Sequence, residues 1–176
     1  MLKNNKTQYN YFCEKCESMN PQAILQFASN QLKKPSDNPF DALKKICEYL
    51  RNNLDHYDWV GFYFHHKEKP KLVLKAYAGE PTEHQEIPFG KGICGQVAET
   101  DTFFRVDNVN NQENYIACSI HTKSELVVPI FVNAKNVGQI DIDSHQQNAF
   151  TSKDEKMLEK LNQLIAEYIK QNDLSA

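Results

Sequence analysis

The chain has 176 residues, of which 40% are hydrophobic and 24% are charged, so it can bury a sizeable core and does not have the composition of a disordered protein. Twenty basic residues stand against 23 acidic residues, a net charge of −3, which gives no electrostatic reason to bind nucleic acid or an anionic membrane. No apolar run is long enough for a transmembrane helix, and the N-terminus lacks a signal-peptide pattern. We therefore expect a cytoplasmic protein whose five cysteines are mostly reduced thiols.

The first part of the chain predicts an arm followed by two helices. Residues 1–19 are polar and predict an N-terminal arm, whereas 20–172 predict one domain. An Asn-Pro pair is typical of a helix start, and the apolar residues after it predict a helix near 21–34. A second apolar stripe at helical spacing predicts a helix over 41–53.

The pattern then changes to the period of two that is typical of strands. Strands are predicted at 58–66, 71–77, 85–89, 103–106, 125–132 and 137–143. A short helix over 93–99 and a long polar loop over 107–123 interrupt them, and a capping box at Ser152-Lys153-Asp154-Glu155 opens a terminal helix. This order predicts an α+β fold, with helices packed on one face of a mostly antiparallel sheet.

Three acidic residues fall on one face of that sheet. Asp141 and Asp143 are two residues apart on a strand, so their side chains share a face about 7 Å apart, and Ile140 and Ile142 take the other face. Counting back through the hairpin places Glu125 opposite or diagonal to Asp143. Mutual repulsion raises at least one carboxyl pKa, which suits a proton donor. The alternative is an ordinary solvated sheet face.

Two cysteines stand out from the others. Cys94 lies among glycines near the start of the short helix, where the helix dipole lowers a thiol pKa. A small buried thiol in a tight turn is an equally good interpretation. Cys118 lies in the long polar loop, where packing explains a cysteine less well than it explains Cys47 on an apolar helix stripe.

The aromatic strand at 58–66 allows two interpretations. Trp59, Gly61 and Tyr63 share a face, so the two aromatic side chains could form the wall of a small-molecule pocket. They could equally be core residues, and periodicity alone favours the core.

We predict no metal site. Cys13-x-x-Cys16 is either half of a tetrahedral zinc site or a redox pair, and the sequence has no second pair to complete a zinc site. His65 and His66 are adjacent on a strand, so they point to opposite faces and cannot chelate one ion well.

Five segments carry a resemblance to a known family: DWVGFY (58–63), IPFGKGICG (87–95), YIAC (115–118), SELVVPI (124–130) and GQIDIDS (138–144). With them, the stretch 58–169, about two thirds of the chain, resembles the free methionine-(R)-sulfoxide reductase branch of the GAF domain proteins. The resemblance implies a GAF fold with a six-stranded antiparallel sheet. It also implies an enzyme without a cofactor that reduces free L-methionine-(R)-sulfoxide and is recycled by thioredoxin.

The resemblance also implies roles for individual residues. The family cysteines match Cys94 and Cys118, and the mechanism runs through a sulfenic acid and a disulfide. Which cysteine attacks is left open, although a loop position favours Cys118. The family's ligand-binding and acid residues match Trp59, Tyr63, Glu125, Asp141 and Asp143; of these, Glu125 and Asp143 are expected to act in catalysis with the cysteines.

The sequence departs from the family pattern at three places. His84 stands where the family has a third cysteine, Ser119 replaces an acid, and 78–82 replaces a run of small residues. These departures leave open a second function, a non-catalytic GAF domain that binds a small molecule and acts as a sensor. A scaffold protein is a third option. The sequence does not define the assembly state, for which a homodimer is one option.

Overall fold

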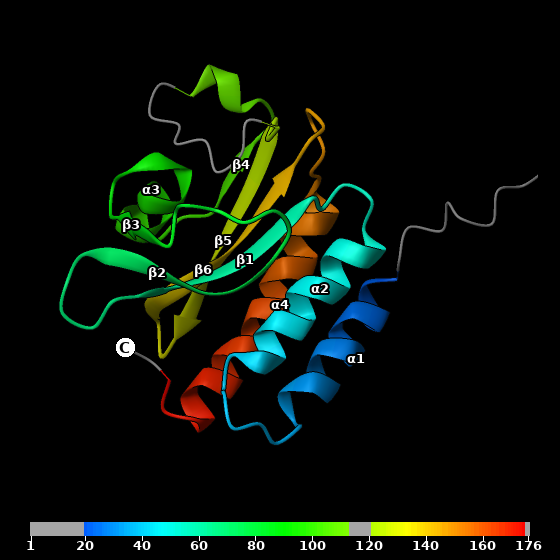
Figure 1. Ribbon diagram of the computed structural model, residues 1–176, viewed down its shortest axis with the longest axis vertical. Helices are drawn as coiled ribbons and strands as arrows, with labels where there is room; N and C mark the ends of the chain where they lie inside the picture. Colours follow the sequence, from blue (N-terminus) through cyan, green and yellow to red (C-terminus); the bar gives the residue numbers. More distant parts are fainter. Residues whose placement is uncertain (1–19, 113–120, 175–176) are drawn as a thin grey trace, which may run out of the picture.

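The computed structural model describes residues 20–112 and 121–174 (Figure 1). The predicted arm at 1–19, together with Cys13, Cys16, Cys118 and Ser119, lies outside the described residues. The described helices are α1 (Pro21–Leu32), α2 (Asp41–Asn53), α3 (Gly92–Thr100) and α4 (Ser152–Gln171), with a 3-10 turn, η1 (Val109–Asn111). The strands are β1 (Trp59–His65), β2 (Lys71–Ala78), β3 (Glu86–Pro88), β4 (Phe104–Val106), β5 (Ser124–Val132) and β6 (Lys135–Ser144).

The six strands form one antiparallel sheet in the order β3-β2-β1-β6-β5-β4. Helices α1, α2 and α4 cover one face, as Figure 1 shows, and α3 packs on the opposite face. The predicted α+β fold with a six-stranded antiparallel sheet is therefore confirmed. The expectation of helices on one face only is wrong for α3, because the glycine-rich segment before it turns the chain to the other side.

The alternation along β1 and β6 divides the apolar residues between two cores. Val60, Phe62 and Phe64 of β1 face the three long helices, as do Ile140 and Ile142 of β6. Trp59 and Tyr63 face the other way and pack with Cys94, Val97 and Val127 in a smaller cluster beneath α3. Because successive strand residues alternate between faces, the polar residues of β6 that alternate with Ile140 and Ile142 lie on the same face as this smaller cluster.

A tight turn between β5 and β6 sets the register of the central hairpin. Asn133 and Ala134 have φ values of +50° and +62°, the left-handed conformation that two-residue type I′ turns require. The hairpin therefore closes over two residues, so β6 begins at Lys135, two residues before the predicted strand start.

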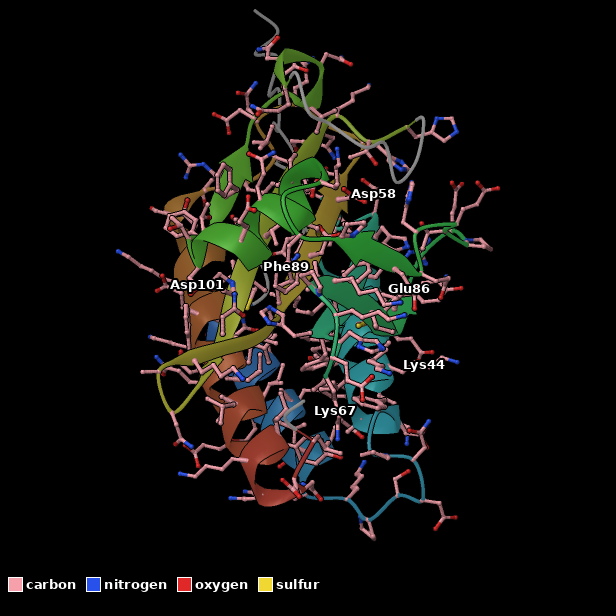
Figure 2. All side chains as sticks on the ribbon, turned by 90° about the vertical axis from the view of Figure 1, so that its left-hand side faces the viewer. Lys44, Asp58, Lys67, Glu86, Phe89 and Asp101 are labelled. Atoms are coloured by element: carbon pink, nitrogen blue, oxygen red, sulfur yellow. The ribbon has the colours of Figure 1, made fainter. Side chains whose placement is uncertain are left out.

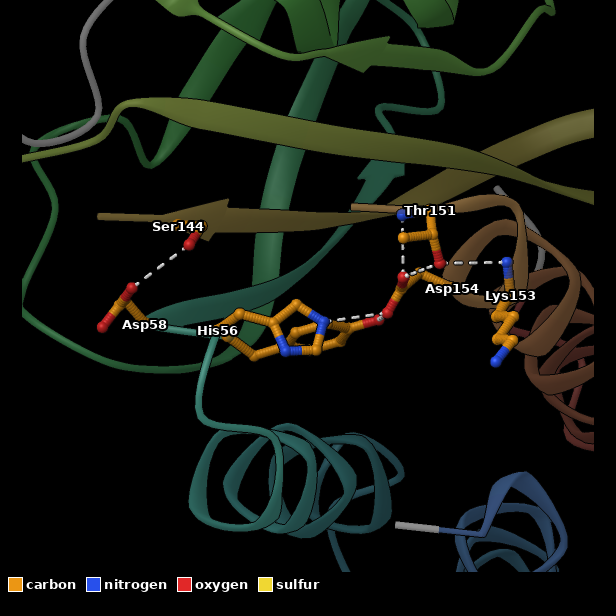
Figure 3. Close-up of polar contacts among 7 residues, drawn as sticks. His56, Asp58, Ser144, Thr151, Lys153 and Asp154 are labelled. Atoms are coloured by element: carbon orange, nitrogen blue, oxygen red, sulfur yellow. Dashed lines mark hydrogen bonds and ion pairs between the residues drawn. The ribbon is translucent and has the colours of Figure 1, made fainter. Parts of the chain in front are cut away.

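The start of α4 differs from the predicted capping box by one residue. Thr151 is the N-cap: its hydroxyl accepts from the Lys153 amide (3.2 Å), and the Asp154 carboxylate accepts from the Thr151 amide (2.8 Å; Figure 3). The prediction that Ser152 and Glu155 form the box is wrong. Asp154 also accepts from His56 (2.9 Å) and Tyr57 (3.1 Å), and these contacts select the register.

None of the described helices is both long and apolar enough to cross a bilayer.

Candidate functional site

The site is built on a cluster of three buried carboxyl groups on the α3 face of the sheet. Glu125 and Asp143 are direct partners in the β5–β6 ladder, and Asp141 lies two residues before Asp143 on β6. All three side chains are at most 2% exposed. Sequence reasoning placed these residues on one face, and the structure brings them together there. They do not form the solvated sheet face that was the alternative.

The β1 strand supplies the neighbours of these carboxyl groups. Trp59 pairs with Asp143, and Gly61 pairs with Asp141. The cluster thus lies toward the end of β1 that follows Asp58, which Figure 2 shows at the opposite end of the strand from Lys67.

Burial decides the protonation of the cluster. Burial, followed by the charges of Asp141 and Asp143, raises the pKa of Glu125 well above its usual range. Burial and the charges of Asp141 and Asp58 likewise raise the pKa of Asp143. For Asp141, burial raises the pKa to about 7, although the neighbouring Cys94 and Glu125 side chains lower it. The cluster therefore holds protons at neutral pH that isolated carboxylates would have lost.

The carboxyl oxygens of Asp141 and Asp143 have few hydrogen-bond partners among the described residues. Apart from the Cys94 and Glu125 side chains beside Asp141, no described residue offers a hydrogen bond to either oxygen of Asp141 or of Asp143, and all four oxygens are buried. Buried polar groups are normally satisfied, so such groups call for a bound ligand or water. An ammonium group or a protonated oxygen supplies the donors that this cluster lacks.

Cys94 lies against the carboxyl cluster. It is the third residue of α3 and 4% exposed, and its Sγ is 3.9 Å from Oε1 of Glu125. The carbonyl of Cys94 accepts from Nε2 of Gln139 on β6 (3.2 Å), which fastens the start of α3 to the sheet. The thiol is buried, as one of the two interpretations from the sequence expected, and it also faces the acids. The other interpretation, a thiol pKa lowered by the helix dipole, stays a prediction.

The predicted pocket aromatics lie on the same face. Trp59 stacks on Tyr77, with ring centroids 5.7 Å apart, and its indole N–H donates to the carbonyl of Glu80 (3.1 Å). The Tyr63 hydroxyl donates to the carbonyl of His84 (2.9 Å). Both aromatic side chains belong to the smaller core. Through these hydrogen bonds, both hold the segment between β2 and β3 against that core. This segment contains most of the residues in which the sequence departs from the family.

Two further positions were missed by sequence reasoning. Gly61 lies under the indole of Trp59, and a Cβ at this position would collide with the six-membered ring. Asp58 accepts from the amide of His145 (2.7 Å) and also faces the Ser144 hydroxyl (Figure 3), so it fixes the end of β6 directly after Asp143. The sequence signal that could have pointed to Asp58 was its position directly before Trp59, at the start of the predicted strand. Gly61 could be recognised only once the direction of the Trp59 ring was known.

The long loop that carries Cys118 starts and ends beside this site. Its described flanks include η1, with Val109 buried, and the amide of Val109 donates to the carbonyl of Lys123 (3.0 Å). Lys123 in turn donates to the carbonyl of Ser144 at the end of β6 (2.8 Å). The predicted continuous loop thus contains a 3-10 turn, and Cys118 itself lies outside the described residues.

The structure also brings together three potential metal ligands. One ligand atom each of Cys94, Glu125 and Asp141 lies within 4.8 Å of the other two. Sequence reasoning considered only ligands that are close in the sequence, and therefore did not consider this set.

Comparison with known proteins gives a consistent result. Residues 37–170 match the family model described as GAF domain. The free methionine-R-sulfoxide reductase of Saccharomyces cerevisiae is 43% identical over 110 residues, 61% of each chain. The protein of that name from Escherichia coli is 34% identical over 119 residues, 68% of this chain and 70% of its own. Among solved structures, the free methionine-R-sulfoxide reductase of Neisseria meningitidis, in complex with its substrate, superposes with a TM-score of 0.80 at 26% identity, covering 89% of this chain and 92% of that one.

Proposed function

Because the chain belongs to the GAF domain family and to its free methionine-(R)-sulfoxide reductase branch, we propose that it reduces free L-methionine-(R)-sulfoxide to methionine. The observation that carries this proposal is the buried cluster of Glu125, Asp141 and Asp143 with Cys94 at its edge. A free amino acid brings an ammonium group, and its sulfoxide brings an oxygen that must be protonated. A cluster of partly protonated acids serves both needs.

The ligand is held between the carboxyl groups and the aromatic face. Asp141 receives the ammonium group, because its pKa of about 7 leaves it partly ionised at neutral pH. Trp59 and Tyr63 contact the side chain of the ligand, since both lie in the apolar cluster on the same face. Glu125 and Asp143, whose pKa values burial raises well above their usual range, retain the proton that the sulfoxide oxygen takes up.

The chemistry consumes two thiols for each sulfoxide. The thiolate of Cys118 attacks the sulfoxide sulfur while a carboxylic acid protonates the oxygen, and methionine leaves as the cysteine becomes a sulfenic acid. Cys94 then condenses with the sulfenic acid, releasing water and forming a disulfide. Cys94 is almost completely buried at the start of α3, whereas Cys118 lies in the loop predicted over 107–123, which is why we assign Cys118 the attack and Cys94 the second step.

Thioredoxin is the proposed reductant of that disulfide, and cytoplasmic location and a homodimer stay predictions. His84 occupies the position of the third family cysteine, so two thiols must complete the cycle. Tyr63 binds the backbone carbonyl of His84, and a carbonyl is present whatever the side chain. The replacement therefore leaves this tether of the pocket unchanged and affects only recycling.

The test is NADPH consumption coupled through thioredoxin, with the R and S epimers of free methionine sulfoxide supplied separately. We expect turnover with the R epimer and only background with the S epimer. Equal rates with both epimers, or none with either, would contradict the proposal.

The missing third cysteine favours one alternative, a GAF domain that only binds its ligand. Single-turnover assays of the fully reduced protein separate the two functions. A reductase releases about one methionine per chain in a burst, even if recycling is slow. Ligand binding without a burst would establish the binding-only function.

A further inference from the structure

The side chains of Cys94, Glu125 and Asp141 form a set of ligands with the chemistry that zinc prefers. Thiolate sulfur and carboxylate oxygen both bind Zn²⁺, at about 2.3 Å and 2.0–2.2 Å respectively. Ligands at those distances from a tetrahedral ion lie roughly 3.5 Å from one another. The Cys94 Sγ and Glu125 Oε1 atoms are 3.9 Å apart, and Asp141 offers an oxygen within 4.8 Å of both. Small side-chain rotations are enough to close the set around one ion.

The unsatisfied oxygens beside the set are independent evidence for a cationic occupant. Both oxygens of Asp143 are buried without a hydrogen bond from any described residue, and the buried oxygens of Asp141 have only Cys94 and Glu125, the other members of the set, as described neighbours able to bond them. Neither of these residues forms an ion pair with a lysine, an arginine or a histidine among the described residues. A buried acidic cluster that no described basic side chain neutralises favours a cationic ligand, and a divalent ion neutralises more of its charge than one ammonium group does.

The backbone holds this set in place. Asp141 and Glu125 come from the two central strands of one hairpin, and Cys94 is fixed to the same sheet through its carbonyl and Gln139. Side chains on rigid elements lose little entropy when they bind a metal ion. This set is therefore better suited to hold an ion than a cluster of flexible surface side chains would be.

We propose that the reduced protein binds one Zn²⁺ ion through Cys94, Glu125 and Asp141, leaving a fourth position open. The ion takes the place that the proposed function gives to the ammonium and sulfoxide groups of the substrate. Zinc is therefore a reversible inhibitor that competes with methionine sulfoxide, and it masks the Cys94 thiol while it is bound. The inhibition rests on the proposed function, whereas the metal site itself does not.

The experiment uses Co²⁺ as a spectroscopic probe of zinc sites, because a thiolate ligand gives cobalt a charge-transfer absorption that a carboxylate does not. Reduced full-length protein carrying Cys13→Ser and Cys16→Ser is titrated with Co²⁺ under anaerobic conditions without substrate. We expect one equivalent to bind with a thiolate band, and Zn²⁺ to displace it. The band should disappear in Cys94→Ser. Affinity should fall in Glu125→Gln and Asp141→Asn by roughly 10–100-fold or more, since even outer-shell partners of metal ions are worth that much.

Cys47→Ser is the matched control, because Cys47 is also a buried thiol but lies in the core under the three long helices. It should leave the cobalt spectrum unchanged. A second measurement needs no site variant: Zn²⁺ should protect Cys94 of the wild-type chain from alkylation, as mapped by mass spectrometry. A thiolate band that persists in Cys94→Ser, or no protection of Cys94, would overturn the proposal. An inactive protein that still binds Co²⁺ in this way would overturn the reductase but support the site.

Discussion

Glu125 and Asp143 face each other directly across the β5–β6 ladder, and both side chains are 2% exposed. Two acids in this arrangement cannot both ionise cheaply, because each is desolvated and each repels the other or the neighbouring Asp141. Burial, the first cause of the shift, and this repulsion raise the pKa of each residue. The pair can therefore keep a proton at a pH at which isolated carboxyl groups are ionised, and it lies on the same face of the sheet as the Cys94 thiol.

The first prediction concerns this pair. Asp143→Asn and Glu125→Gln keep the shape of the side chains but remove the acidic proton, so turnover of free methionine-(R)-sulfoxide should fall by roughly 10²–10⁴, the usual value of general acid–base help. Steady-state kinetics of both variants provide the measurement. Glu86→Gln is the matched control, because Glu86 is an exposed carboxylate on β3 that pairs with Lys71. Normal kinetics in both site variants would remove the pair from the mechanism.

The second prediction is a reversible disulfide between Cys94 and Cys118. Both match the cysteines of the family, and a bond between them requires their Cα atoms to come within about 7 Å. Peptide mapping after mild treatment with peroxide or methionine sulfoxide should recover the 94–118 link, and thioredoxin should remove it.

Cys47 provides the internal control for that experiment. It is completely buried in the larger core, and burial raises its pKa well above the usual range, so it should stay unmodified. Oxidation confined to Cys13 and Cys16 would rule out the 94–118 cycle.

The carboxyl cluster could be predicted because its geometry is local. Strand alternation places Asp141 and Asp143 on one face, and a short hairpin turn brings Glu125 opposite Asp143. The contact between Cys94 and Glu125 could not be predicted in this way, since it joins residues 31 positions apart and depends on how α3 packs against the sheet.

Two other outcomes depended on tertiary contacts. The sequence around the start of α4 fits a capping box on Thr151 as well as on Ser152, and only the contacts of Asp154 with His56 and Tyr57 distinguish them. For Trp59 the sequence left open a core position, which periodicity favoured, and a pocket wall. It is in fact part of a core that has the carboxyl cluster on the same face.

The third prediction concerns the pH dependence of stability. Burial alone would raise the pKa of Asp154, but hydrogen bonds from His56 and Thr151 outweigh it and bring the pKa down to about 2. A depressed pKa means that the stabilisation is fully present above the unfolded value near 3.9 and is lost as the pH falls through 2. The shift corresponds to about 2 kcal/mol of unfolding free energy at neutral pH.

Urea unfolding of the wild type and of Asp154→Asn measures this contribution. Asparagine can still accept the Thr151 amide, so the variant removes the charge and keeps the cap. The stability difference should be about 2 kcal/mol at pH 7 and should shrink steadily between pH 4 and pH 2. Glu155→Gln, one residue further on and paired with Arg105 at the surface, is the control and should cost at most about 1 kcal/mol. A difference for Asp154→Asn that does not change with pH would contradict the assignment.

The fourth prediction concerns Gly61 as the residue that positions Trp59. The indole lies over this glycine, is fixed at its N–H by the carbonyl of Glu80, and is only 6% exposed. Gly61→Ala should push the ring outward, break the hydrogen bond to Glu80 and disturb the proposed ligand site. Because Trp59 is the only tryptophan in the sequence, its fluorescence reports this change without interference.

We expect the emission of Gly61→Ala to move to longer wavelength and the KM for methionine sulfoxide to rise about tenfold, the equivalent of losing an aromatic contact of about 1.4 kcal/mol. Val60→Ala is the control, since Val60 is the adjacent residue of β1 but faces the long helices. It should lower the unfolding free energy by about 0.5–3 kcal/mol and leave both the emission of the folded protein and the KM unchanged. If Gly61→Ala also kept the wild-type emission and KM, then the indole would have another way to lie in the pocket, and Gly61 would have no positioning role.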